Sequence, residues 1–416
     1  WAIANSGVTY RLMGNYDAAP PDLDRAIELN EKDSWAIANR GVTYRLMGNY
    51  DAALPDLDQA IELNENYSWA IANRGVTYRL VGNYDAALSD LDRAIDLDEN
   101  NASIFANRGV TYRLMGNYEA ALADFDRAID LDENYNWAIA NRGVTYRLMG
   151  NYEAALPDLD RAIELDENYS WAIANRGVTY GQMSNYEAAL PDLDRAIELD
   201  ENDSWAIANR GVTYGQMSNY DAALADLDRA IALNENYDWA IANRGVTYLL
   251  MGNYEAAIAD FNRAIALDEN GSLAITGRGA TYRLLGNYEA ALTDLDRAIN
   301  LGDTNDWHYY QRGLVYLIMN NADQTQSDFT RAIDLADQEY ETKPKNWQNT
   351  FNLALYYLAA GKTKESEDLY RVVLSESVSH FAIREAIHDL SDFLHHFPDH
   401  SQAQAMHSLL QQQLEG

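Results

Sequence analysis

Apolar and small residues recur in the same order every 34 residues from residue 1 to residue 340, which gives ten consecutive copies of one repeat. In the copy from Trp137 to Ser170 they occupy positions 3, 7 and 10, and then positions 19, 23, 26 and 27, counted from the tryptophan. Both sets have the spacing of one face of an α-helix, and a Gly-Asn pair at positions 14 and 15 separates them. Each repeat is therefore predicted to form two helices, A and B, joined by a tight turn.

The two predicted helices face each other through small residues. In the same copy, Gly143 on helix A and Ala155 on helix B stand where a larger side chain would push the two backbones apart. Asn151 precedes helix B and is predicted to cap its N-terminus, because an Asn side chain accepts a hydrogen bond from the first turn.

This pattern resembles the tetratricopeptide repeat. Gly at position 7, Tyr at 10, Gly at 14, Tyr at 16, Ala at 19, an apolar residue at 23 and Ala at 26 agree with the signature of that family, which has the same 34-residue period. Ten consecutive matches in the same register make this resemblance specific. The resemblance implies an all-α fold, a right-handed superhelical α-solenoid of helix-turn-helix units, in which helix A lines a concave groove.

The sequence predicts three blocks along the chain. Residues 1–340 hold the ten tandem repeats, and residues 341–381 hold a seven-residue insertion followed by a degenerate eleventh repeat. Residues 382–416 are predicted to form capping helices, because a solenoid needs a terminal element with a polar outer face. The chain starts without Met at position 1 of a repeat, so we expect the natural protein to extend further at this end.

The composition narrows the possible partners. The chain has 31 Lys and Arg against 65 Asp and Glu, a net charge of −34, and such a chain repels phosphate backbones. Binding of nucleic acid is therefore not expected. No apolar run approaches the length of a membrane helix, no signal segment opens the chain, and cysteine is absent. We expect a cytoplasmic protein without membrane contact.

A column of asparagines at position 5 of helix A is the first candidate site. Such side-chain amides can each offer one donor and one acceptor to the backbone of an extended peptide, as in the asparagine ladder of O-linked N-acetylglucosamine transferases and kinesin light chains, which this column resembles. The alternative is that these amides bond only to neighbouring repeats. The predicted peptide-binding residues are Asn39, Asn73, Asn107, Asn141, Asn175, Asn209 and Asn243.

Tryptophans at position 1 form a second column. Indole rings along a groove supply apolar anchors for a partner, and the alternative is that each ring packs onto the end of the preceding helix B. The column comprises Trp1, Trp35, Trp69, Trp137, Trp171, Trp205, Trp239 and Trp307, of which Trp137, Trp171 and Trp205 are predicted to line the groove.

Arginines at positions 6 and 11 have different predicted roles. Arginine at position 6, such as Arg142, is assigned to structure, because it faces the aspartates of helix B. Position 11 lines the groove with arginine in the first five repeats, Arg113 and Arg147 among them, but repeats 6 to 8 carry Gly181, Gly215 and Leu249. This coherent change indicates either a separate specificity patch, with an arginine half that prefers acidic residues, or drift among duplicated copies.

Catalytic chemistry has little support in the sequence. No phosphate-binding glycine loop and no nucleophile elbow occur. His388, Asp392 and His395 share one helical face, a spacing that a metal could use, but histidines at a helix end are common without one. We expect no enzyme activity, no cofactor and no metal.

The sequence thus predicts a non-catalytic protein interaction module that binds an extended peptide or a folded partner in the groove lined by helix A. One alternative is the C-terminal sensor arm of a larger bacterial signalling NTPase or effector protein. Another is a structural spacer, or a scaffold that stacks end to end through the apolar end of its first repeat. We expect a monomer unless such stacking occurs.

Overall fold

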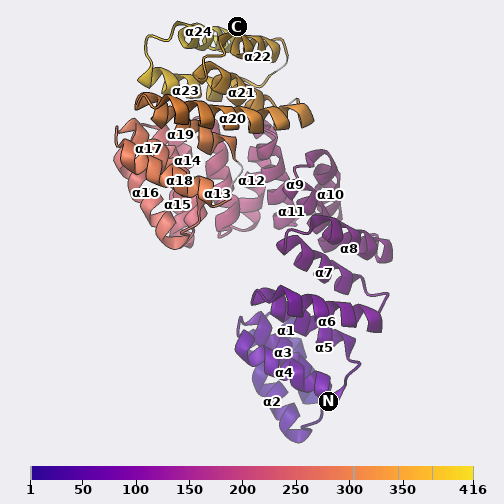
Figure 1. The fold of residues 1–416 in the computed structure, drawn as a ribbon. Coiled ribbons are helices and arrows are strands. Elements are labelled where there is room, and N and C mark those ends of the chain that lie inside the picture. Colours follow the sequence, from indigo (N-terminus) through magenta and orange to yellow (C-terminus); the bar gives the residue numbers. More distant parts are fainter. Residues whose placement is uncertain (1, 303–304, 345, 377, 416) are drawn as a thin grey trace. The chain divides into compact units, whose positions relative to one another are not determined.

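The computed structural model describes residues 2–302, 305–344, 346–376 and 378–415, and every helix or turn in these residues belongs to an all-α fold without strands. Trp1, the first tryptophan of its column, lies outside the described residues. Consecutive α-helices pair as antiparallel hairpins, with A helices odd-numbered and B helices even-numbered (Figure 1). This confirms the predicted solenoid of helix-turn-helix units.

The chain divides into two compact parts, residues 1–179 and residues 180–416. The first part contains α1 (Ala2–Leu12), a 3-10 turn η1 (Tyr16–Ala18), α2 (Ala19–Leu29), α3 (Ser34–Leu46), α4 (Tyr50–Leu63), α5 (Ser68–Leu80), α6 (Tyr84–Leu97), α7 (Ala102–Leu114), α8 (Tyr118–Leu131), α9 (Asn136–Leu148) and α10 (Tyr152–Leu165). Helix α11 (Ser170–Gln182) spans the division.

The second part continues the helix hairpins to the C-terminal end of the described residues. Its helices are α12 (Tyr186–Leu199), α13 (Ser204–Gln216), α14 (Tyr220–Leu233), α15 (Asp238–Leu250), α16 (Tyr254–Leu267), α17 (Ser272–Leu284), α18 (Tyr288–Asn300), α19 (Asp306–Ile318), α20 (Ala322–Thr342), α21 (Trp347–Ala359), α22 (Thr363–Leu374), α23 (His380–His396) and α24 (Ser401–Glu415). No helix among the described residues combines the length and apolarity that a bilayer crossing requires.

The turn between helices A and B is built by two adjacent residues. In repeat 4, Gly116 adopts φ of 76°, a left-handed conformation that glycine takes without a steric penalty. The next residue, Asn117, donates its backbone N–H to the Tyr112 carbonyl at 2.9 Å, and its side chain accepts from the Ala120 N–H at 3.3 Å. The predicted asparagine cap is confirmed, because Asn151 caps α10 in the same way. In repeat 7, however, Ser218 takes the glycine position with φ of 60°.

The close approach of the two helices is also confirmed. A Cβ atom on Gly143 would lie 3.1 Å from both the Ala155 carbonyl oxygen and the Leu159 side chain, tighter than ordinary packing. Ala155 and Leu159 are fully buried. Position 7 therefore stays small because the partner backbone occupies the space.

The C-terminal helices share a core with repeat 10. Tyr310 of α19 packs against Tyr356 of α21, with ring centroids 4.8 Å apart, and Leu390 and Phe393 of α23 belong to the same buried cluster. This continuous apolar contact holds α23 against the end of the repeat array.

Candidate functional site

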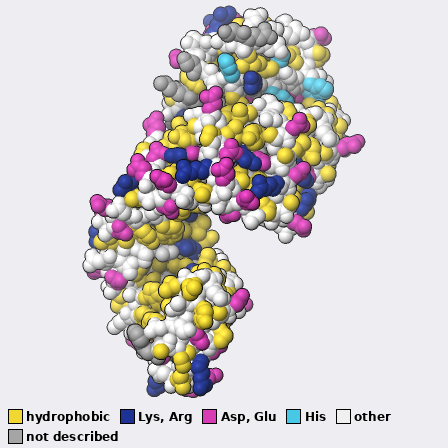
Figure 2. Space-filling model, turned by 180° about the vertical axis from the view of Figure 1, so that it is seen from behind, with side chains coloured by type: hydrophobic (Ala, Val, Ile, Leu, Met, Phe, Trp, Pro, Cys, Tyr) yellow, Lys and Arg dark blue, Asp and Glu magenta, His cyan; other side chains and the backbone are white. Residues whose placement is uncertain are grey.

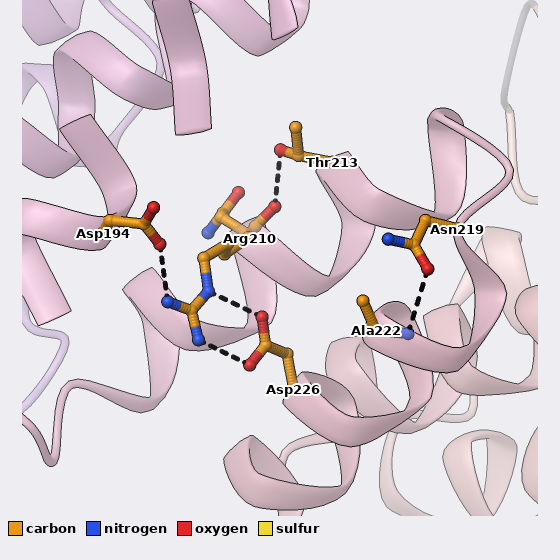
Figure 3. A network of polar contacts seen from close by, with 7 residues as sticks. Asp194, Arg210, Thr213, Asn219, Ala222 and Asp226 are labelled. Carbon is orange, nitrogen blue, oxygen red and sulfur yellow. Dashed lines mark hydrogen bonds and ion pairs between the residues drawn. The ribbon is translucent and has the colours of Figure 1, made fainter. Parts of the chain in front are cut away.

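Each arginine at position 6 links two successive repeats. Arg210 of α13 donates from Nε and Nη2 to the two carboxylate oxygens of Asp226 on α14, both at 2.7 Å, and from Nη1 to Asp194 on α12 at 2.7 Å (Figure 3). The same double contact recurs at Arg40, Arg74, Arg108, Arg142, Arg244 and Arg312. The predicted structural role of position 6 is confirmed.

These ion pairs also account for part of the acidic composition. The hydrogen bonds that Arg210 donates to Asp226 are the largest influence on its pKa and raise it above the ordinary value, so the guanidinium is charged at all accessible pH. On the face drawn in Figure 2, acidic and basic side chains lie beside one another across the C-terminal part of the chain. Position 6 therefore has a structural role, and side chains that could bind a partner must lie at other positions of helix A.

The asparagine column makes a uniform contact inside its own helix. Asn141 donates from Nδ2 to the Trp137 carbonyl at 2.8 Å, and its own carbonyl accepts from the Thr145 hydroxyl at 2.8 Å. The Nδ2 bond to the residue four positions earlier has the same length at Asn39, Asn73, Asn107, Asn175, Asn209 and Asn243. Asn141 is 2% exposed. One amide donor of each ladder residue is thus engaged within the protein.

The amide oxygen of the ladder meets the arginine at position 11 of the preceding repeat. Arg113 donates from Nη2 to Asn141 Oδ1 at 3.5 Å, and Arg147 donates to Asn175 at 3.3 Å. The bonds from Arg11, Arg45 and Arg79 to the next asparagine repeat this arrangement. In residues 1–179, therefore, the predicted asparagine ladder and the predicted groove arginines form one column.

Burial and mutual repulsion perturb the charge of this column. Burial, and then the neighbouring charges of Arg45 and Arg113, lower the pKa of Arg79 to about 10. Burial also lowers the pKa of Arg113 and Arg147. Because each charge disfavours the next, the column is a stretch of the surface on which a negative group would relieve repulsion.

The column is interrupted in the second part of the chain. Gly181 and Gly215 replace the arginine at position 11, and a residue without a side chain cannot donate to the amide oxygens of Asn209 and Asn243. Both asparagines keep the bond to their own helix. The sequence change in repeats 6 to 8 therefore alters the hydrogen bonding of the ladder, and not only the charge.

The tryptophan column is placed at the junctions between repeats. Trp137 and Trp171 are half-buried, and their rings lie 6.1 and 6.0 Å from the rings of Tyr135 and Tyr169, at the end of the preceding repeat. Trp205 is also half-buried. The structure thus brings each ring into the packing between repeats, while part of its surface still faces solvent.

Helix α23 lies against the A-helix side of the second part, which the sequence pattern did not predict. Phe381 at its start stacks edge to face on Tyr186 of repeat 6, with ring centroids 4.6 Å apart. Asp392, three turns later, accepts from Arg283 Nη2 of α17 at 2.6 Å, and Arg283 is only 1% exposed. The helix therefore passes from repeat 6 to repeat 9 along the surface where the ladder would bind a peptide.

Two cavities remain between α23 and the A helices. The first, of about 550 Å³, is lined from α13, α15, α19, α20, α21 and α23, and the second, of about 560 Å³, from α15, α17, α19 and α23. They share Trp307, His388 and Asp389 as walls. We refer to the two cavities together as the α23 chamber.

The ionisable groups of the chamber are strongly affected by burial. Burial raises the pKa of Glu385 to about 7, and burial with the charges of Glu385 and Asp392 raises the pKa of Asp389 well above its ordinary value. Burial lowers the pKa of His388, although Asp392 opposes the shift. Among the described residues, no three His, Asp or Glu side chains are arranged to hold a metal ion. In the part of the chain that the structure describes, Asp392 pairs with Arg283, whereas Glu385 and Asp389 have no ion-pair partner.

Family models match the chain along most of its length. Models described as Tetratricopeptide repeat match residues 2–33, 34–67, 102–135, 137–169, 170–203, 204–237, 239–270 and 321–377, and models described as TPR repeat match residues 75–116 and 279–319. No curated protein matches the chain.

Solved structures with the same arrangement of helices are distant in sequence. A tetratricopeptide repeat protein from Parabacteroides merdae is 21% identical, with a TM-score of 0.50 over 60% of this chain and 98% of its own. The human IFIT1 dimer with m7Gppp-AAAA is 15% identical, with a TM-score of 0.54 over 82% of this chain and 90% of its own. At these identities the likeness concerns the fold alone.

Proposed function

This chain belongs to the tetratricopeptide repeat family, and from that premise we propose that it is a non-catalytic module that binds an extended peptide segment on the surface of its A helices. Repeats of this family generally serve as scaffolds for protein or peptide partners, and they are generally not catalytic. The proposal adds the surface and the contacts by which the partner is held.

The observation that carries the proposal is the column of arginine and asparagine in residues 1–179. A guanidinium has five N–H donors, and the bond from Arg113 to Asn141 uses one of them. The asparagine bond fixes the direction of the arginine, so the remaining donors are pre-organised for carbonyl or carboxylate groups of a peptide. In this proposal the asparagines position the arginines, and the exposed edges of Trp137 and Trp171 supply apolar contact.

The test is selection of peptides from a random 12-residue display library on the intact chain, followed by measurement of Kd for the selected peptides. The double variant Arg113→Gln plus Arg147→Gln should weaken them at least tenfold, and Asn141→Ala plus Asn175→Ala should weaken them as well. The matched control is Arg161→Gln plus Glu164→Gln on the exposed face of α10, which should leave Kd unchanged. Selection of no peptide, or equal Kd in all variants, would refute the proposal.

The same proposal places the protein in the cytoplasm as a monomer that contacts neither nucleic acid nor membrane. Solution scattering over a range of concentrations checks the monomer. A mass that rises with concentration would favour the stacking scaffold instead.

A further inference from the structure

We propose that the α23 chamber binds two neighbouring side chains of a partner peptide, one basic and one apolar, with the basic group at its carboxyl-lined end and the apolar group at its leucine-lined end. This inference rests on the proposed function and specifies the partner's chemistry. It concerns the second part of the chain, where the arginine column is interrupted.

The first cavity has more acidic than basic side chains on its walls. Glu385 and Asp389 are four residues apart on α23 and line it together, with Asp306 and Glu339 from the neighbouring helices. Among the described residues that line this cavity, Arg384 is the one guanidinium, and it is exposed. Carboxyl groups enclosed in this way favour a cation that enters with hydrogen-bond donors, such as the ammonium group of lysine or the guanidinium of arginine.

The position of the missing cation is defined by the repeat itself. Arg283 occupies position 11 of repeat 9 and pairs with Asp392 of α23. At the same position of repeat 7 stands Gly215, which lines the first cavity, as Glu385 does. A Cβ atom on Gly215 would meet only Ala223 and Thr247, both at 3.7 Å, so the space for a side chain is open. A basic side chain of a partner would therefore take the place that arginine holds elsewhere.

The second cavity is apolar over much of its wall. Leu249 replaces arginine at position 11 of repeat 8, and Leu250, Leu273 and Leu284 line the same cavity. An apolar side chain would fill this leucine-lined wall.

The two cavities share walls, which places the two side chains on adjacent residues of the ligand. Because Trp307 and Asp389 line both, a basic group in the first cavity and an apolar group in the second belong to neighbouring residues of one ligand. Cavities of about 550 and 560 Å³ lie within the range of protein sites for small ligands.

The test uses capped dipeptides of lysine, norleucine or glutamate followed by leucine, titrated onto the full chain and followed by NMR of labelled methyl groups. Norleucine has the carbon chain of lysine without the ammonium group. The lysine dipeptide should bind at least tenfold more tightly than the norleucine dipeptide, and the glutamate dipeptide should not bind. Equal Kd for lysine and norleucine, or no binding of the lysine dipeptide, would overturn the inference.

Two variants locate the site. Gly215→Arg places an arginine in the wall of the first cavity and should weaken the lysine dipeptide at least tenfold. Gly181→Arg is the matched control: it adds the same charge at the same repeat position, a Cβ there meets only Thr213 at 3.8 Å, and Gly181 lines neither cavity. Equal loss in both variants would assign the effect to net charge and would contradict the inference.

A further variant tests the carboxyl groups without changing either glycine. Glu385→Gln plus Asp389→Asn preserves side-chain size and should abolish the preference for lysine over norleucine while leucine still binds. If library peptides bind the chain without a basic-apolar pair, the inference fails and the proposed function stands. If no peptide binds anywhere, the proposed function fails as well.

Discussion

At the scale of the residue, the arginine of position 6 joins each repeat to the one before it through ion pairs. Arg142 makes two bonds to Asp158 within its own repeat and one to Asp126 of the preceding repeat, all between 2.7 and 2.8 Å. Asp158 is 8% exposed, so loss of the arginine would leave a buried carboxylate without compensation.

Arg142→Ala should therefore destabilise its hairpin by about 2 kcal/mol, because removal of one partner from a largely buried pair costs more than loss of a surface pair. Amide hydrogen exchange in α9 and α10 measures the change locally. Arg161→Ala is the control, since its side chain is 49% exposed, its ion pair with Glu164 spans one turn of the same helix, and its other bond goes to the exposed Asn134 side chain. Equal effects of the two changes would show that position 6 contributes no more than a surface charge.

A second residue-scale prediction concerns the turn between helices A and B. Ser218→Gly should stabilise repeat 7 by about 0.5–1 kcal/mol, because serine at φ of 60° carries a steric cost that glycine lacks. Gly116→Ser, at φ of 76° in repeat 4 with open space around the added Cβ, should destabilise by a similar amount. Urea unfolding of both variants checks the pair. Changes of the same sign would contradict this explanation.

At the scale of the element, the sequence predicted the repeats but not the position of α23. Helix hairpins, the asparagine cap and the pairing of position 6 follow from contacts between neighbours in the 34-residue period, such as Gly143 with Ala155. The bond between Arg283 and Asp392 joins residues 109 apart, and one of them lies outside the periodic region. Periodicity cannot reveal such a contact, because it carries no information on where a non-repeating helix packs.

The same limit applies to the ladder. The sequence identified the asparagines and the change at Gly181 and Gly215, but the bond from Arg113 to Asn141 depends on how successive A helices lie beside one another. The sequence suggested that the asparagines could bond to a neighbouring repeat. It did not indicate the bond from Asn141 to the Trp137 carbonyl, which lies within one helix. Whether the ladder binds peptide stays a prediction.

Docking of α23 should depend on pH through Glu385. Its pKa is raised from 4.5 to about 7, so the docked helix favours the protonated acid, and this stabilisation is complete below pH 4.5 and lost as pH rises through 7. Hydrogen-exchange protection of α23 should fall between pH 5 and 8 after correction for intrinsic exchange. Asp389 has its pKa raised in the same direction, while Arg384 and His388 are the nearby basic groups.

Glu385→Gln should flatten this pH profile, because glutamine stays neutral throughout. Glu365→Gln, an exposed change on α22, is the control and should leave the profile as it is. A pH dependence that persists unchanged in Glu385→Gln would assign the effect to another group.

At the scale of the whole molecule, the net charge of −34 is the dominant long-range property. It should prevent retention of a 20-nucleotide RNA at 10 mM salt, despite the arginines of the A helices, because the Debye length is then about 30 Å and the RNA meets the summed charge of the surface. A gel-shift titration checks this. Retention that disappears in Arg113→Gln plus Arg147→Gln would instead identify the arginine column as a phosphate-binding surface.

The contacts of position 6 have a consequence for the length of the protein. Outside its own repeat, each of these arginines bonds to an aspartate of the repeat before it, so removal of residues 69–102 would bring Arg108 next to Asp58, which now pairs with Arg74. The new junction would have the chemistry of the old one. A gene of this kind can therefore gain or lose whole repeats by duplication or deletion. The protein becomes longer or shorter, while the position 6 ion pair at each junction between repeats stays the same.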